Sequence, residues 1–243
     1  RSVLTLADPG VEAAALAVAR SCLELLDISR HEGVHPRLGV VDVVPFVLLD
    51  GTLLSDEGAL LSRGEPDVGG GREEVAARDR FSQVFSEDGV PCFYYGPERS
   101  LPEVRRRAWR DLLPDAGPTR PHPTAGACCT GARALLVAYN LFVRGTLADA
   151  RAVAGELRSQ DVRTLAFEVG GLPQVSCNLL DPLVTGPSEA FEAVSQRLPV
   201  LRAELVGLLP ARALYNIAPE RYEELGVSPA ATIEARLADR RLY

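Results

Sequence analysis

The sequence predicts a mixed α/β (α+β) fold of two small subdomains, each a β-sheet covered by helices, with a cleft between them. Strand-like and helix-like segments alternate along the chain, and such alternation favours helices packed on sheets. The 243 residues are enough for two small domains of ordinary size. Residues 114–127, near the midpoint, include four prolines and two glycines and cannot be regular throughout. We therefore expect one subdomain at 1–128 and a second at 129–243.

The first half opens with a β-α-β pattern. Residues 2–6 alternate as a strand would, and Asp8 before Pro9 is typical of a helix N-cap followed by proline at the first helical position. The apolar residues that recur on one face of this helix are Ala15, Val18, Ala19, Cys22, Leu25 and Leu26. After a loop at 31–39, the nearly continuous apolar run at 40–49 predicts a strand that is buried on both faces.

The rest of the first half begins with a polar, glycine-rich segment at 50–71, which predicts an exposed loop. Its three consecutive glycines are weak evidence of a phosphate site, because the lysine and the serine or threonine of a P-loop are missing. We then expect a helix at 73–87, a strand at 90–96 and a helix at 101–113, whose arginines would form a solvated face.

The second half continues the alternation of strands and helices. Thr146 is expected to cap the first of its helices. The expected elements are, in order, a strand at 134–143, a helix at 147–157, paired strands at 164–169 and 174–178 around a glycine-rich turn, a helix that starts at 186–188, a strand at 203–209 and helices to the end of the chain.

Composition excludes several classes of protein. The formal net charge of −7 argues against a nucleic-acid-binding surface, which would need a basic face. No apolar run approaches the roughly 20 residues that span a bilayer, so we expect no membrane contact. The five cysteines lack a C-x-x-C spacing and include the adjacent pair Cys128 and Cys129, which favours packing roles in a reducing, cytoplasmic compartment. The three dispersed histidines predict no metal site.

Residues 31–46 concentrate the chemistry that the sequence offers. His31 and His35 precede Arg37, and an imidazole can give and take protons near neutral pH. A catalytic or anion-binding corner is one interpretation, and a polar surface turn is the other. For His31 we favour a position at a helix C-terminus, where the backbone dipole stabilises a cation.

The motifs of this chain, taken together, resemble the formiminotransferase domain of the glutamate formiminotransferase family. They follow the family's order along nearly the whole chain. They are 31–39, Asp42, 45–46, 90–91, 95–96, 117–118, 122–123, 126–127, 131–133, 138–140, 145–146, 174–181 and 205–207. The resemblance implies transfer of a formimino group from N-formimino-L-glutamate to tetrahydrofolate, a co-substrate, in histidine degradation, with no need of a metal. It also implies the two-subdomain fold, and members of the family often pair as homodimers.

The resemblance also assigns site residues. The family's catalytic histidine falls on His35, which we expect to be the acid-base catalyst, and its folate-contacting loop falls on 117–126. The further candidates for binding substrate or folate are Arg37, Gly117, Pro118, Arg120, His122, Gly126, Arg133, Gln174 and Asn178. The arginines suit the carboxylates of glutamate and folate, although each alone could be a surface ion pair. His122 could instead stack on proline, and Gln174 and Asn178 could satisfy a sheet edge.

The chain departs from the family at its beginning. Family members have a first strand and helix and then a segment Asp-x-Gly-Pro-x-x-Asn-Arg, of which only the last residue has a counterpart, Arg1. The acidic residue of that segment could orient the catalytic imidazole. A non-catalytic relative that binds folate or a small anion on the same scaffold is therefore the alternative.

Overall fold

The computed structural model describes residues 2–7, 10–49 and 71–239. These residues form two compact units, each with its own sheet. The three-stranded unit comprises 6–7, 10–48 and 71–134, and the four-stranded unit comprises 2–5, 49 and 135–239. The predicted mixed α/β fold with two subdomains is confirmed. No helix within these described residues is both long and apolar enough to cross a membrane.

The three-stranded unit has a parallel sheet. Its strands are β1 (Val43–Phe46), β2 (Cys92–Tyr95) and β3 (Cys128–Ala132), in the order β1-β3-β2. Parallel strands need long connections, and α3 (Arg72–Glu87) and α4 (Leu101–Arg107) lie in the two connections of this sheet. Helix α1 (Val11–Leu25) and a short 3-10 turn, η1 (Ile28–Arg30), precede β1.

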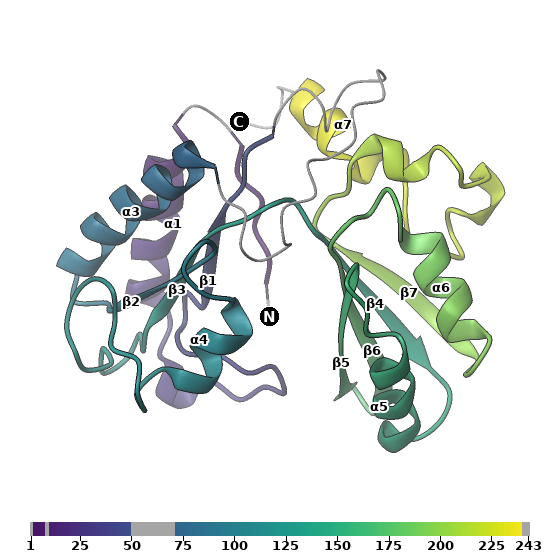
Figure 1. Cartoon of the computed structure of the whole chain (residues 1–243), viewed down its shortest axis with the longest axis horizontal. Helices are drawn as coiled ribbons and strands as arrows, with labels where there is room; N and C mark the ends of the chain where they lie inside the picture. Colours follow the sequence, from purple (N-terminus) through teal and green to yellow (C-terminus); the bar gives the residue numbers. More distant parts are fainter. Residues whose placement is uncertain (1, 8–9, 50–70, 240–243) are drawn as a thin grey trace. The chain divides into compact units, whose positions relative to one another are not determined.

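Helices cover both faces of this sheet (Figure 1). Neighbouring residues of a strand point to opposite faces, so Cys128 packs with Ala19 of α1 and Phe85 of α3, whereas Cys129 packs with Val104 of α4. All of these side chains are buried. The unit is therefore a three-layer arrangement in which α1 and α3 lie on one face and α4 on the other.

The four-stranded unit has an antiparallel sheet. Its strands are β4 (Val137–Val143), β5 (Val162–Val169), β6 (Leu172–Leu179) and β7 (Val200–Val206), in the order β5-β6-β4-β7. Helices α5 (Leu147–Glu156) and α6 (Pro187–Ser195) pack on one face over an apolar core that includes Tyr139, Leu141 and Leu179. The chain continues through the 3-10 turns η2 (Ala211–Leu214), η3 (Pro219–Arg221) and η4 (Pro229–Ala231) to α7 (Ile233–Ala238).

Several elements match the sequence prediction closely. Thr146 caps α5, because its hydroxyl accepts the Asp149 N–H at 3.1 Å while the Asp149 carboxylate accepts the Thr146 N–H at 2.8 Å. The predicted pair of strands is the β5–β6 hairpin. Its two-residue turn, Gly170 and Gly171, has φ values of 60° and 77°, and this left-handed conformation favours glycine.

Other elements differ from the prediction. Residues 2–6 form no strand, the expected strand at 40–49 is limited to Val43–Phe46, and β3 was not predicted. The helix expected at 101–113 ends at Arg107, because Trp109 has a left-handed φ of 66°. The Trp109 ring packs edge-on against Phe93, with their centroids 4.9 Å apart. Asp8 and 50–70 lie outside the described residues.

Candidate functional site

Two loops meet at the amino edge of the three-stranded sheet, where β1 and β3 begin. The Val40 N–H donates to the Ala125 carbonyl at 2.9 Å, and the Ala127 N–H donates to the Leu38 carbonyl at 3.0 Å. Between these bonds the backbones touch, since a Cβ on Gly39 or on Gly126 would lie inside 3.0 Å of a carbonyl oxygen of the other loop. Gly126 also has a φ of 74°. Only glycine therefore fits at both positions.

The first loop carries His35 and Arg37. The Arg37 guanidinium donates to the carbonyls of Gly33 at 3.0 Å and His35 at 3.2 Å, and also to that of His31. It thus closes the loop around its own backbone. His35 is half-buried and His31 is exposed. The His31 N–H caps η1 by donating to the Ile28 carbonyl at 3.2 Å.

The second loop carries His122, which closes a tight turn. Backbone bonds join His122 and Gly126 in both directions, at 2.8 and 2.9 Å, and the His122 Nδ1 accepts the Ala125 N–H at 3.1 Å. Because Nδ1 is the acceptor, hydrogen bonding assigns the proton of the neutral ring to Nε2. The His122 ring is half-buried, close to the Gly89 backbone.

The start of the predicted folate loop lies at the same edge of the sheet. The Cys92 N–H, at the beginning of β2, donates to the Ala116 carbonyl at 2.9 Å. Gly117 has a φ of 84°, and a Cβ there would meet the Ser86 side chain at 2.8 Å. Pro118 and Arg120 follow and are exposed. The segments that carry His35, Arg37, Gly117, His122 and Gly126 therefore all lie at the amino edge of the three-stranded sheet.

Arg133 lies at the opposite, carboxyl edge. It follows β3, whose 5 residues separate the two edges by about 15 Å at the usual rise per residue of a strand. Its N–H donates to the Phe46 carbonyl at 3.2 Å, and its guanidinium donates to the Ala134 carbonyl at 2.7 Å. Burial raises the pKa of the neighbouring Tyr95 to about 12, although the Arg133 charge opposes that rise.

Gln174 and Asn178 belong to the four-stranded unit. Both lie on β6, on the sheet face opposite α5 and α6. Gln174 is buried at 5% exposure and Asn178 is exposed. The same face carries Asn140, whose amide donates to Glu204 at 3.3 Å, and Arg202, whose guanidinium lies 4.0 Å from the centre of the Phe142 ring. This face mixes polar side chains with the apolar Phe142, Leu165 and Phe167, whereas the face under the helices is apolar.

Asp42 is a residue of the first loop that sequence reasoning did not place in the site. Its Oδ1 accepts the Leu38 N–H at 2.8 Å and its Oδ2 accepts the Arg105 Nη2 at 2.6 Å, while its carbonyl accepts the Cys129 N–H at 2.9 Å. The sequence does contain a sign of its role, because Asp42 is a lone carboxylate within an apolar run and such a group needs a partner when it is shielded from water. The partner is 63 positions away in the sequence.

Three buried cysteines are poor nucleophiles in this structure. Burial raises the pKa of the Cys92, Cys129 and Cys177 thiols to about 12, so little thiolate forms near neutral pH. In the part of the chain that the structure describes, no three His, Cys, Asp or Glu side chains form a group that could hold a metal ion.

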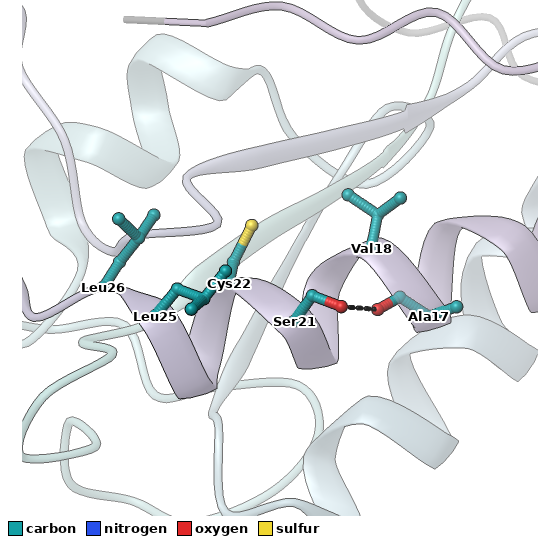
Figure 2. Close-up of a pocket in the computed structure, with 6 residues that line it drawn as sticks. All are labelled: Ala17, Val18, Ser21, Cys22, Leu25 and Leu26. Carbon is teal, nitrogen blue, oxygen red and sulfur yellow. Dashed lines mark hydrogen bonds between the residues drawn. The ribbon is translucent and has the colours of Figure 1, made fainter.

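An apolar pocket of about 350 Å³ lies on α1, apart from these residues. Figure 2 shows the six residues that line it, among which the Ser21 hydroxyl donates to the Ala17 carbonyl at 3.1 Å. They are Ala17, Val18, Ser21, Cys22, Leu25 and Leu26. None of the candidate site residues lines this pocket.

Comparison with known proteins gives consistent results. A sequence model of the formiminotransferase domain, N-terminal subdomain, matches residues 1–133. The glutamate formimidoyltransferases of Streptococcus pyogenes serotype M1 and Thermoplasma acidophilum are 30% and 29% identical to the chain. The matches cover 90% and 98% of this chain and 78% and 83% of those proteins.

The formimidoyltransferase-cyclodeaminase of Sus scrofa is similar as well. It is 33% identical over 238 residues, which cover 84% of this chain and 41% of that protein. The chain thus spans about two fifths of the length of the formimidoyltransferase-cyclodeaminase that it matches.

Proposed function

The chain belongs to the formiminotransferase domain family, and from this premise we propose that it transfers a formimino group from N-formimino-L-glutamate to tetrahydrofolate. The observation that carries the proposal is the pair of loops at the amino edge of the three-stranded sheet. The loop with His35 and the loop with His122 come from distant parts of the sequence and are joined backbone to backbone. A binding site built from two loops requires that they keep fixed positions relative to each other, and these backbone hydrogen bonds hold them there.

The reaction needs two proton transfers. A nitrogen of tetrahydrofolate attacks the amidine carbon, and the resulting tetrahedral intermediate expels the glutamate nitrogen. The attacking nitrogen loses a proton and the departing nitrogen gains one. In this proposal the His35 imidazole accepts the first proton and donates it to the glutamate nitrogen, so that the histidine ends in its starting state.

The other candidates would bind the substrates. Arg120 is exposed in the predicted folate loop, where a guanidinium can pair with a carboxylate through two hydrogen bonds. Arg37 already donates to three carbonyls of its own loop, so we assign it to the shape of that loop as well as to anion binding. His122 would offer its Nε2–H to the pterin or to the formimino group.

The experiment is a transfer assay with formiminoglutamate and tetrahydrofolate, in which glutamate release is measured. We expect His35→Ala to lower kcat by about 10²- to 10⁴-fold, the usual contribution of a general acid-base group. His31→Ala is the matched control, because it removes the same ring four positions away and leaves the backbone carbonyl that Arg37 uses.

Two outcomes would contradict the proposal. Unchanged kinetics in His35→Ala would remove the catalytic role of this residue. Tight binding of tetrahydrofolate without any turnover in the unsubstituted protein would favour the non-catalytic relative on the same scaffold.

A further inference from the structure

We propose that the ion pair between Asp42 and Arg105 positions the loop that carries His35, and that both residues act on the reaction through that loop rather than by touching substrate. The inference rests on the proposed role of His35 for its effect on catalysis. Its structural part, that α4 controls the geometry of the loop, can be tested without any substrate.

The pair is well shielded for a salt bridge. The Arg105 Nη2 and Asp42 Oδ2 atoms are 2.6 Å apart, and the two side chains are 20% and 22% exposed. Arg105 projects from α4, whereas Asp42 ends the loop immediately before β1. The pair therefore connects the helix on one face of the sheet to the amino edge, where the two loops meet.

Asp42 transmits this connection to the loop. Its second oxygen accepts the Leu38 N–H at 2.8 Å, so a single carboxylate holds both the helix and the loop. Leu38 directly follows Arg37, whose guanidinium donates to the His35 carbonyl at 3.2 Å. The path from α4 to His35 thus consists of three side-chain contacts and the backbone between Arg37 and Leu38.

A second ion pair in the same unit provides a matched comparison. The Arg99 Nη1 and Asp115 Oδ2 atoms are also 2.6 Å apart, with 18% and 21% exposure, and Asp115 also accepts one backbone N–H, that of Tyr94, at 2.8 Å. Arg99 also donates to the second Asp115 oxygen at 3.1 Å and to the Tyr94 carbonyl at 3.2 Å, so this pair should contribute at least as much to folding as the pair of Arg105 with Asp42. They differ in what the aspartate holds, which is the His35 loop in one case and β2 in the other.

The kinetic test compares Arg105→Ala with Arg99→Ala in the complete protein. We expect Arg105→Ala to lower kcat roughly tenfold to a hundredfold, because a displacement of about 1 Å in a catalytic group has an effect of this size. The KM for formiminoglutamate should change less than threefold. Arg99→Ala should lower the melting temperature at least as much as Arg105→Ala does, with kcat nearly unchanged. Arg105→Lys should recover part of kcat, since an ammonium group can still hold one carboxylate oxygen.

The second test measures the surroundings of the His35 ring directly. The chain has three histidines, so the ring Cε1–H signal of each can be assigned in a nuclear magnetic resonance spectrum by single substitutions. Arg105→Ala should shift or broaden the His35 signal, whereas Arg99→Ala should leave it in place. Asp42→Asn, which keeps the shape of the side chain, gives the same test if Arg105→Ala does not fold.

The outcomes separate the two proposals. If the unsubstituted protein transfers no formimino group, the proposed function fails, and the His35 signal still decides the positioning role. If Arg105→Ala and Arg99→Ala lower kcat equally, or if neither moves the His35 signal, the positioning role is wrong.

Discussion

In the three-stranded unit the candidate residues lie in loops, whereas in the four-stranded unit they lie on a strand. Gln174 and Asn178 are held by the ladder that pairs β6 with β4 and β5, and their direction follows from the alternation of the strand. His35 and His122 have no such ladder. Close contacts at two glycines hold both of their loops, together with one ion pair for the His35 loop and a tight turn for the His122 loop. Loop positions therefore depend on many individual contacts, so single substitutions there should have larger effects.

The largest effect should come from the contact between the two loops. Gly126→Ala places a Cβ against the Leu38 carbonyl at a φ of 74°, and we expect a loss of about 3 kcal/mol in the free energy of unfolding. Gly170→Ala in the β5–β6 turn is the control, because its φ of 60° is also left-handed but no atom lies within 4 Å of a Cβ there. It should cost only about 1 kcal/mol. Urea unfolding measures both, and equal losses would contradict the role of the contact.

Glu98→Gln should have the next largest effect. The Arg78 side chain is only 1% exposed, and its guanidinium donates to both Glu98 oxygens, at 2.6 and 2.7 Å. Glu98 is itself 37% exposed and Arg78 keeps a second partner, Asp79, at 2.9 Å, so weakening the pair should cost about 1 kcal/mol. Glu192→Gln in the four-stranded unit is the control. Its pair with Arg221 is 2.7 Å long but joins side chains 49% and 33% exposed, so its loss should cost less than about 0.5 kcal/mol.

The pair of Arg78 with Glu98 also predicts how the free energy of unfolding depends on pH. The hydrogen bond from Arg78 is the main cause that holds the pKa of Glu98 below its ordinary value of 4.5. The unfolded chain therefore binds the proton more readily, and the stabilisation is complete above pH 4.5 and is lost as the pH falls through the lowered pKa of the folded state. The difference in unfolding free energy between the native protein and Glu98→Gln should thus shrink below pH 4.5. A difference that grows on acidification would contradict this assignment.

The smallest effect on stability should come from the strand. Asn178 is exposed, so Asn178→Ala should change the free energy of unfolding by less than about 0.5 kcal/mol. If Asn178 contacts tetrahydrofolate, the loss of one hydrogen bond should raise the Kd about fivefold. Glu168→Ala, on the other face of the same hairpin, is the control for calorimetric titration. Equal Kd values for the two variants would remove Asn178 from the proposed binding surface.

The features that the sequence predicts correctly are set by residues close together in the chain. The capping of α5 by Thr146 and the hairpin turn at Gly170 and Gly171 follow from local chemistry, and both are confirmed. Strand β3 was missed because its sequence, CCTGA, has little strand character by itself. Gly131 fits there because the Tyr95 ring from β2 occupies the space above it. That contact is set by the fold rather than by local pattern.

The candidate site shows the same division. The loop with His35 and Arg37 is a prediction that the sequence allows because its residues are close together in the chain. Asp42 and Arg105 were not found as a pair, because 63 positions separate them and nothing local relates one to the other. The position of Arg133 at the far edge of the sheet likewise follows only from the strand order.

Trp109, in its left-handed conformation beside Phe93, gives this protein a built-in optical probe. It is the only tryptophan of the chain, and it lies in the three-stranded unit directly after α4. Its emission therefore reports the melting of that unit alone, whereas circular dichroism records both sheets. Recorded together, the two signals reveal whether the three-stranded unit and the four-stranded unit unfold in one cooperative transition or in separate steps.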